Sequence, residues 1–322
     1  MKRLVLAGAV VLSIVGRLSA AEEPWLVYAA TRVDKAPVID GRLSDPCWQG
    51  IERSRSLTCI GGAAAPVATT GMVCWDDQNL YIAMICAEPQ MAAIQQERVE
   101  QRLQPFYESV EIFIDAAYDR HTCLQFRVDI SGNRDTHVGA DFDATLEKRW
   151  TGAAAQGQNE WTVELAIPWT LLADGRPAEK TIWGLNLNRN RAIATDGGWT
   201  CWSDTKGPFL APSHFGDLVF FPYPVFLRSY FSDTLQSVCD EIAGLNRRSP
   251  MAAANCGSKF AAIRAEHEQF LKSLESAPIA RGEDAAAPYA RGLEQQRKLA
   301  SLQDEMMPYV IRDLGSASAK RP

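Results

Sequence analysis

Histidine is scarce in this sequence of 322 residues, and recognisable catalytic or metal-binding motifs are missing. The only histidines are His121, His137, His214 and His267. No serine, cysteine or paired histidine stands in a known nucleophile or zinc motif, and the cysteines form no close CxxC pair. The sequence therefore gives no motif for nucleophilic or zinc-dependent catalysis.

The sequence also has no apolar run long enough to span a membrane, and its longest candidate lies at the N-terminus. Lys2 and Arg3 precede an apolar run over 4–15, and small residues follow at 19–21. This layout is typical of a secretory signal peptide over residues 1–21 with cleavage after Ala21, and the run is shorter than the roughly 20 residues of a permanent span. The first cysteine is Cys47, so no lipid-attachment site adjoins the cleavage point. We expect a secreted or periplasmic protein without a membrane span.

Basic residues are outnumbered, with 33 Lys and Arg against 39 Asp and Glu and a formal net charge of −6. Removal of residues 1–21 deletes three basic residues and no acid, which takes the charge to −9. Binding to nucleic acid requires basic patches that attract phosphate groups. Nucleic acid is therefore not an expected partner, and a neutral ligand or a cation suits the charge better.

Eight cysteines are scattered along the chain, and an exported protein permits disulfides. Cys239 and Cys256 are candidates for a bridge between two helices. The alternative is that they are buried free thiols, which pack as small apolar side chains. Cys74 and Cys86 lie on two strands of an expected hairpin, whose register places them several residues apart.

Residues 25–224 carry signals of β-structure, namely short stretches rich in Val, Ile, Tyr and Trp between Gly, Asp and Asn. Residues 71–75 and 80–86 form an expected hairpin around the turn at 76–79. Apolar and polar residues alternate over 110–115, 161–167 and 183–188, as in strands with one face on a core. These patterns predict an antiparallel β-sandwich with few helices, one beginning at Pro46 and one over 92–103.

After Pro224 the apolar positions recur at helical spacing, and we expect an α-helical extension over 225–314. Its helices are predicted at about 232–247, 251–276 and 284–312. The extension either packs on itself or on the sandwich, or forms a coiled coil with a partner protein. Residues 315–322 are expected to form a disordered tail.

Several segments, in order, resemble the family 9 carbohydrate-binding modules and their sugar- and haem-binding DOMON relatives. They are APVIDGRLSDPCW at 36–48, WDDQNLY at 75–81, ESVEIFID at 108–115, ELAIPW at 164–169, WGLNLNRNR at 183–191, WS at 202–203 and FGDL at 215–218. The resemblance covers residues 36–219 and implies a jelly-roll type of β-sandwich that binds sugars. Where family members often have two acids before Ser-Val-Glu, this chain has Tyr107 and Glu108.

A sugar ring offers an apolar face and a fringe of hydroxyls, so its site requires flat aromatic surfaces beside planar polar groups. Trp75, Trp199 and Trp202 lie at strand ends or in loops and are candidate platforms, although Trp75 and Trp202 are equally compatible with the core. Trp48, Trp161, Trp169 and Trp183 are expected in the core. The candidate polar ligand-binding residues are Arg98, Arg102, Glu111, Asn188, Arg189 and Arg191. The alternative for these is surface solvation or a buried Arg189–Glu111 ion pair.

Asp141 and Asp143, with Asp135 nearby, are candidate ligands of a calcium ion, which prefers carboxylate oxygens in an irregular loop. The alternative is a solvated turn, because the spacing matches no known calcium loop. No other cofactor is expected.

Taken together, the sequence predicts a non-catalytic protein that binds poly- or oligosaccharide, in glycan capture or catabolism. One alternative is a DOMON-like haem module for electron transfer, with axial ligands drawn from Met72, Met84 and His121. The other is a hydrolase acting on a glycan, or an accessory part of one, using two carboxyl groups such as Glu108 and Glu111. An acidic chain offers many such pairs, and no spacing singles one out.

Overall fold

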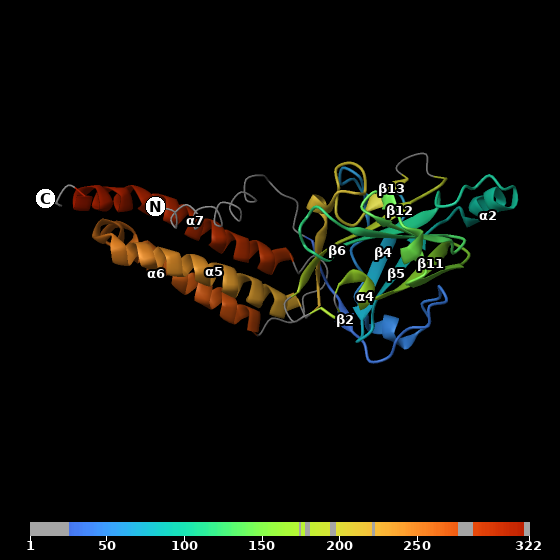
Figure 1. The fold of residues 1–322 in the computed structure, drawn as a ribbon, viewed down its shortest axis with the longest axis horizontal. Coiled ribbons are helices and arrows are strands. Elements are labelled where there is room, and N and C mark those ends of the chain that lie inside the picture. Colours follow the sequence, from blue (N-terminus) through green and yellow to red (C-terminus); the bar gives the residue numbers. More distant parts are fainter. Residues whose placement is uncertain are drawn as a thin grey trace. The chain divides into compact units, whose positions relative to one another are not determined.

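The computed structural model describes residues 26–173, 175–177, 181–193, 198–220, 223–275 and 286–318. The expected signal peptide lies outside these residues. The chain divides into a β-rich unit that ends at Pro222 and a helical unit that begins at Tyr223 (Figure 1). The expected boundary at 225 therefore falls inside the first long helix. Among the described residues, no helix is both long and apolar enough to cross a membrane.

The larger sheet of the β-rich unit has nine strands, seven of which follow the order β1-β14-β12-β6-β7-β8-β9, while β13 and β3 extend it from β12. In that order they are β1 (Val27–Ala29), β14 (Gly216–Val219), β12 (Ile182–Asn190), β6 (Ser109–Asp115), β7 (Leu124–Asp129), β8 (Arg134–Val138), β9 (Asp141–Phe142), β13 (Trp199–Cys201) and β3 (Thr58–Cys59).

The smaller sheet has five strands in the order β10-β11-β5-β4-β2. They are β10 (Thr151–Gln156), β11 (Glu160–Pro168), β5 (Asn79–Ala87), β4 (Thr69–Trp75) and β2 (Thr31–Arg32). Pairing is antiparallel as expected, except that the short strands β1 and β2 run parallel to β14 and β4. The expected hairpin is β4–β5, in which Cys86 pairs with Thr69 and Cys74 pairs with Tyr81.

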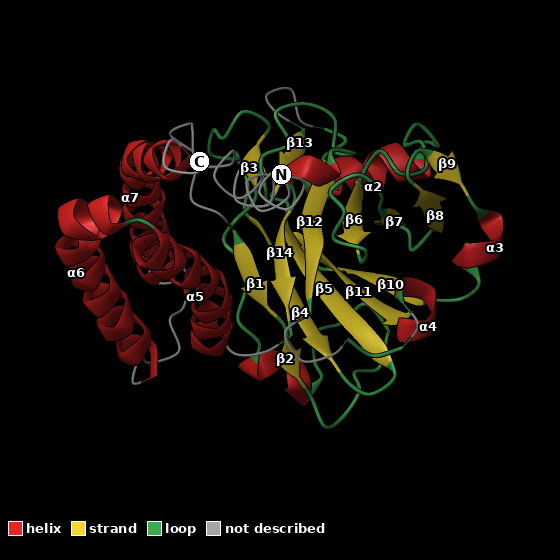
Figure 2. Cartoon of the chain, turned by 60° about the vertical axis from the view of Figure 1, so that its left-hand side comes forward, coloured by secondary structure: helices red, strands yellow, loops and turns green. Residues whose placement is uncertain are grey.

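The two sheets face each other and enclose one apolar core, which makes this unit a β-sandwich (Figure 2). The alternating residues predicted to face inward are there: Ile112 and Leu187 come from the larger sheet, and Ile82 and Leu165 from the smaller. Trp161, Trp169 and Trp183 belong to this core, as expected. Trp48 is also buried but packs on the outer face of the smaller sheet.

Glu164 attaches the N-terminal segment to the outer face of the smaller sheet. Its carboxylate accepts hydrogen bonds from the Trp48 indole at 2.7 Å and from the backbone N–H groups of Asp40 and Gly41 at 3.1 and 2.9 Å. Gly41 has a φ of 81°, and a Cβ atom there would lie 2.4 Å from the backbone of Ala154. Only glycine fits this approach, which explains the Asp-Gly step before the tryptophan.

Short helices decorate the sandwich: η1 (Pro46–Gly50), α2 (Met91–Val99), α3 (Ala144–Glu147), α4 (Trp169–Leu172) and η2 (Pro212–His214). The helix expected at Pro46 is present as a 3-10 helix. The helix expected over 92–103 ends at Val99, and the chain beyond it forms an irregular loop.

The helical unit consists of α5 (Tyr223–Arg248), α6 (Pro250–Glu275) and α7 (Ala286–Ser318), which pack against one another. α5 begins nine residues earlier than predicted because Phe226, Leu227 and Phe231 are buried and extend its apolar stripe. α7 continues to Ser318, so the tail expected from residue 315 is helical as far as the structure describes it.

All eight cysteines are free thiols. The candidate Cys239–Cys256 bridge is therefore not present, and the alternative of free thiols holds. Both side chains are buried on α5 and α6, where each packs as an apolar group.

Candidate functional site

Three strand ends meet on the outer face of the larger sheet, where β12 lies between β6 and β13. Asn190, the last residue of β12, pairs with Ser109 of β6 on one side and with Trp199 of β13 on the other. Residues directly opposite each other on paired strands share a face. The sheet therefore presents Ser109, Asn190 and Trp199 side by side, away from the core.

The Asn190 amide has a fixed orientation. Its Nδ2 donates to Glu111 Oε1 at 2.6 Å and to Ser109 Oγ at 3.3 Å. Both amide hydrogens are thus used inside the protein. The Oδ1 atom accepts no hydrogen bond from the described residues and remains as an acceptor.

Glu111 lies beneath Asn190 on the same face and is buried. Besides Asn190, it accepts a hydrogen bond from Gln125 Nε2 at 2.5 Å, and Arg127 is its partner in the strand pairing. Burial raises the pKa of the Glu111 carboxyl above its ordinary value, while the charge of Arg127 and the two hydrogen bonds act in the opposite direction. Glu111 is therefore a buried polar group that supports Asn190, and it is not exposed to a ligand.

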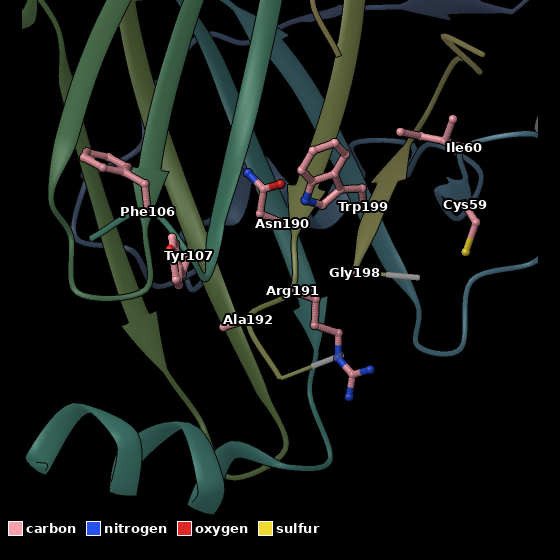
Figure 3. Close-up of a pocket in the computed structure, with 9 residues that line it drawn as sticks. All are labelled: Cys59, Ile60, Phe106, Tyr107, Asn190, Arg191, Ala192, Gly198 and Trp199. Carbon is pink, nitrogen blue, oxygen red and sulfur yellow. The ribbon is translucent and has the colours of Figure 1, made fainter. Parts of the chain in front are cut away.

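A pocket of about 790 Å³ opens over this row of side chains. Its lining comes from the segments Cys59–Ile60, Phe106–Tyr107, Asn190–Ala192 and Gly198–Trp199. Tyr107 and Trp199 are 62% and 59% exposed, although aromatic side chains of this size are usually covered. Figure 3 shows Asn190 between the two, with Arg191 and Ala192 beside them. The pocket thus has an aromatic wall on each side of a fixed amide.

A strained turn holds Tyr107 at the pocket. The N–H of Tyr107 donates to the carbonyl of Gln104 at 3.2 Å, and Phe106 between them has a φ of 63°. A positive φ at the third position of such a turn normally calls for glycine, and another residue costs on the order of 1–3 kcal/mol. The Arg127 guanidinium lies 4.4 Å from the Phe106 ring, and Ser109 Oγ donates to the Phe106 carbonyl at 2.7 Å, so neighbouring groups hold the turn.

Trp199 is supported from behind by the loop that follows β13. The ring of Phe209 lies 5.8 Å from its indole, and Phe209 itself packs with Phe113, Cys123, Cys201 and Phe215 on the sheet. The indole therefore has one supported face and remains largely open to solvent.

The alternative of an Arg189–Glu111 ion pair is wrong, because Arg189 points to the inner side of the sheet and Glu111 to the outer side. Arg189 is 1% exposed and binds Glu108 at 2.7 Å and Glu88 at 3.0 Å. It also donates to the carbonyl of Ala87 at the end of β5. Arg189 thus joins the ends of β5, β6 and β12 beneath the pocket and is not available to a ligand.

Arg191 lines the pocket but also binds inward. Its Nε donates to Glu88 at 2.7 Å, and its Nη2 donates to the other oxygen of the same carboxylate at 3.0 Å. Burial would raise the pKa of Glu88, but the bonds from Arg191 and the Gln90 N–H, with the charges of Arg191 and Arg189, hold it below its ordinary value. Asn188 is fully buried, and its Nδ2 donates to the Glu111 carbonyl.

Two of the three candidate tryptophan platforms lie away from the pocket. Trp202 is 2% exposed, because its indole turns into the core and packs edge-on against Tyr28. Trp75 is half-buried at the far end of β4, where its Nε1 donates to the carbonyl of Ala30 and its ring lies edge-on to Trp169. Trp199 is the one platform of the three that the structure brings to the pocket.

The two candidate arginines that precede β6 differ in their surroundings. Arg102 is exposed and paired with Glu97 at 2.8 Å and with Glu100. Arg98, on α2, lines a second, smaller pocket together with Glu108.

Sequence reasoning missed Tyr107 and Asn190 as site residues. In the sequence, Tyr107 stands where family members often have an acid before Ser-Val-Glu. An aromatic residue at this usually polar position, just before a strand, is the feature that could have identified it. Asn190 belongs to the run 188–191, from which its neighbours were chosen. Which residue of this run faces the pocket depends on the strand pairing with Ser109 and Trp199, and these residues are distant in the sequence.

The candidate calcium ligands do not converge. Asp143 caps α3 by accepting from the Thr145 N–H at 2.8 Å, Asp135 pairs with Arg127, and Asp141 is exposed. Within the described parts of the chain, no group of three or more His, Cys, Asp or Glu side chains is placed to hold a metal ion. A calcium site at Asp141 and Asp143 gains no support from these contacts.

The residues named for the alternative functions are also dispersed. Met84 is buried in the central core, Met72 packs in the separate cluster outside the smaller sheet, and His121 is exposed. Glu108 is 1% exposed and accepts from Trp161 Nε1, from the Ala192 N–H and from Arg189. Its carboxylate is thus committed to internal contacts.

Two curated proteins match this chain over 201 residues. The chain is 30% identical to endo-1,4-beta-xylanase A of Thermotoga neapolitana and 29% identical to the protein of the same name from Thermotoga maritima. Each match covers 60% of this chain but only 18% of the relative. The chain therefore spans less than a fifth of the length of these relatives.

Among solved structures, the chain is similar to a family 9 carbohydrate-binding module from Caldicellulosiruptor kristjanssonii in complex with glucose. The identity is 21% and the TM-score 0.46, over 61% of this chain and 96% of that one. The same module in complex with cellotriose gives 21% and 0.44, over 60% and 92%.

A family model described as "Carbohydrate family 9 binding domain-like" matches residues 39–221, which is more than half of the chain. The match contains every segment quoted above except the first three residues of the most N-terminal one. The chain therefore belongs to the carbohydrate family 9 binding domain-like family.

Proposed function

We propose that this protein binds poly- or oligosaccharide, without catalysing a reaction, in the pocket between Tyr107 and Trp199. The observation that carries the proposal is the pair of exposed aromatic side chains on either side of Asn190 in one pocket. Membership of the family supports it.

The chemistry of the pocket suits a pyranose ring. Aromatic faces cover the apolar C–H face of a sugar, and planar polar groups bond to its hydroxyls. Asn190 Oδ1 accepts from a hydroxyl, because both hydrogens of its amide are already donated to Glu111 and Ser109. The acidic composition of the chain favours a neutral glycan over an anionic one.

The test is calorimetric titration of the full chain with gluco-, xylo- and manno-oligosaccharides, with affinity electrophoresis against the corresponding polysaccharides. We expect binding to at least one series. Trp199→Ala and Tyr107→Ala should each weaken it by about tenfold, since each removes one aromatic contact worth roughly 1.5 kcal/mol. Phe142→Ala is the matched control, because Phe142 is 57% exposed and does not line the pocket.

Two results would contradict binding in this pocket. One is the absence of binding to any sugar in the panel by a folded protein. The other is an equal loss of affinity in all three variants, which would place the sugar elsewhere. Release of reducing sugar on prolonged incubation would contradict the non-catalytic part of the proposal.

We also propose that the protein is exported, with removal of residues 1–21, and acts in glycan capture or catabolism outside the cytoplasm. The support is the charged, apolar and small-residue layout of the N-terminal segment. N-terminal sequencing of the protein recovered from the periplasm or medium should begin at Glu22. Recovery of the intact chain from the cytoplasm alone would contradict export.

A further inference from the structure

A second pocket, of about 300 Å³, lies on the other side of the turn that carries Tyr107. Its polar lining is supplied by Arg98, Gln101, Gln104, Glu108, Asp129, Ser131 and Asn133. Its volume is at the lower end of the range for small-molecule sites and suits one small ring.

The two carboxylates in this pocket are already saturated by the protein. Asp129 Oδ1 accepts from the N–H groups of Ser131 and Asn133 at 2.8 and 2.9 Å, and Oδ2 accepts from Asn133 Nδ2 at 2.7 Å. Glu108 is held by Arg189 and Trp161. Neither acid forms an ion pair with Arg98.

Apart from Asn133, which donates to Asp129, the remaining polar side chains of the pocket are uncommitted. The side chains of Arg98, Gln101, Gln104 and Ser131 form no hydrogen bond or ion pair with any residue that the structure describes. Arg102, four residues from Arg98, differs from it in being paired with two acids, Glu97 and Glu100. One guanidinium, two amides and a hydroxyl are thus free to bind the hydroxyl groups of a ligand.

The two pockets share a wall that is one turn thick. Gln104 and Glu108 line the second pocket, whereas Phe106 and Tyr107, which lie between them, line the first. The hydrogen bond from the Tyr107 N–H to the Gln104 carbonyl closes this turn, and the Cα atoms at the ends of such a turn are less than about 7 Å apart. A ligand of several sugar units bound in the first pocket is therefore long enough to reach the second.

Backbone strain in the same segment supports a binding role. Gln101 and Phe106 have φ values of 56° and 63°, although neither is glycine. Such conformations are costly and concentrate at ligand-binding loops. Phe106 lies within the turn that separates the pockets, and Gln101 lines the second pocket.

We propose that the second pocket is a further subsite for a neutral oligosaccharide, with Arg98 as its principal hydrogen-bond donor. The inference rests on the proposed function, because the same glycan chain occupies the first pocket. The protein then prefers oligosaccharides that span the Gln104–Tyr107 turn over single sugars.

The experiment is calorimetric titration of the full chain with a monosaccharide and its linear tetrasaccharide, in the gluco-, xylo- and manno-series. The measured quantity is the ratio of the two affinities in the series that binds best. We expect the tetrasaccharide to bind more tightly, and Arg98→Ala to lower the ratio about tenfold, as for loss of a charged hydrogen-bond donor. Gln104→Ala should lower the ratio in the same direction.

Arg53→Ala is the matched control, because Arg53 is exposed and lines neither pocket. Equal affinities for monosaccharide and tetrasaccharide in the wild-type protein would overturn the inference, and so would wild-type ratios in both variants. In either case, binding that depends on Trp199 would leave the first pocket supported. Failure of every sugar to bind would instead refute the proposed function, and this inference with it.

Discussion

Arg189 and Asn190 are neighbours in the sequence but lie on opposite faces of β12. Arg189 is sealed in the interior with Glu88 and Glu108, while Asn190 faces the pocket. The alternation of a strand assigns residues to two faces, but it does not say which polar residue is buried. The burial of Arg189 depends on Glu88 at the end of a strand in the other sheet, and local sequence does not reveal that partner.

Replacement of Arg189 tests the structural role of this buried ion pair. Arg189→Met should lower the free energy of unfolding by about 3–5 kcal/mol, because it leaves the buried carboxylate of Glu108 without its arginine and removes one of the two arginines that bind Glu88. Denaturant unfolding followed by tryptophan fluorescence measures the change. Arg53→Met is the control, because Arg53 is an exposed arginine that is expected to contribute little.

A double variant separates loss of the ion pair from loss of packing. Adding Glu108→Gln to Arg189→Met removes the carboxylate charge that has lost its arginine, while Glu88 keeps Arg191, and should recover part of the lost stability. If the double variant is no more stable than Arg189→Met, the charge of Glu108 is not what makes the loss costly.

Among the elements, the long strands were predictable and the ends of the helices were not. Alternation identified β6, β11 and β12 and their inward residues, because one face of each meets the core. α5 begins before the predicted residue 232 because Phe226 and Phe231 are buried and belong to the helix. Aromatic side chains near a helix start resemble loop or strand residues until their burial in the bundle is known.

α6 carries a buried histidine, from which we expect the stability of the helical unit to depend on pH. His267 is 3% exposed, and its Nδ1 has no hydrogen-bond partner among the described residues. Burial lowers the pKa of His267 from its ordinary value of 6.5, with the nearby charge of Glu268 acting in the opposite direction. The folded unit therefore favours neutral histidine. Its stability is fully present above the ordinary pKa and declines as the pH falls below 6.5.

Replacement of His267 by leucine should remove this dependence. Between about pH 8 and pH 5, the stability of His267→Leu should rise relative to that of the wild-type protein, because the wild type must protonate on unfolding. Urea unfolding followed by far-UV circular dichroism at each pH measures the difference. His121→Leu serves as control, because His121 is exposed on the sandwich. A pH-independent difference for His267→Leu would contradict this account.

At the scale of the whole molecule, the sandwich, the helical extension and the order of the family segments were all evident in the sequence. Of the residues that line the candidate pocket, Trp199 and Arg191 were among those predicted from the sequence and Tyr107 was not, while Trp75 lies away from the pocket. In an antiparallel sandwich, successive strands end at opposite ends of the molecule. Trp75 ends β4 beside Leu80, whereas the pocket lies at the end near Thr69 and Ala87. Only the assembled strand pairing reveals which strand ends meet.

The central claim is that a sugar ring lies between Tyr107 and Trp199 over Asn190. A crystal structure of the protein soaked with the tightest-binding oligosaccharide tests it most directly. The account predicts density for a ring against the Trp199 indole, with a hydroxyl within hydrogen-bond distance of Asn190 Oδ1. Sugar bound at another place, such as the Trp75 end of the sandwich, with the Trp199 indole bare, would contradict it.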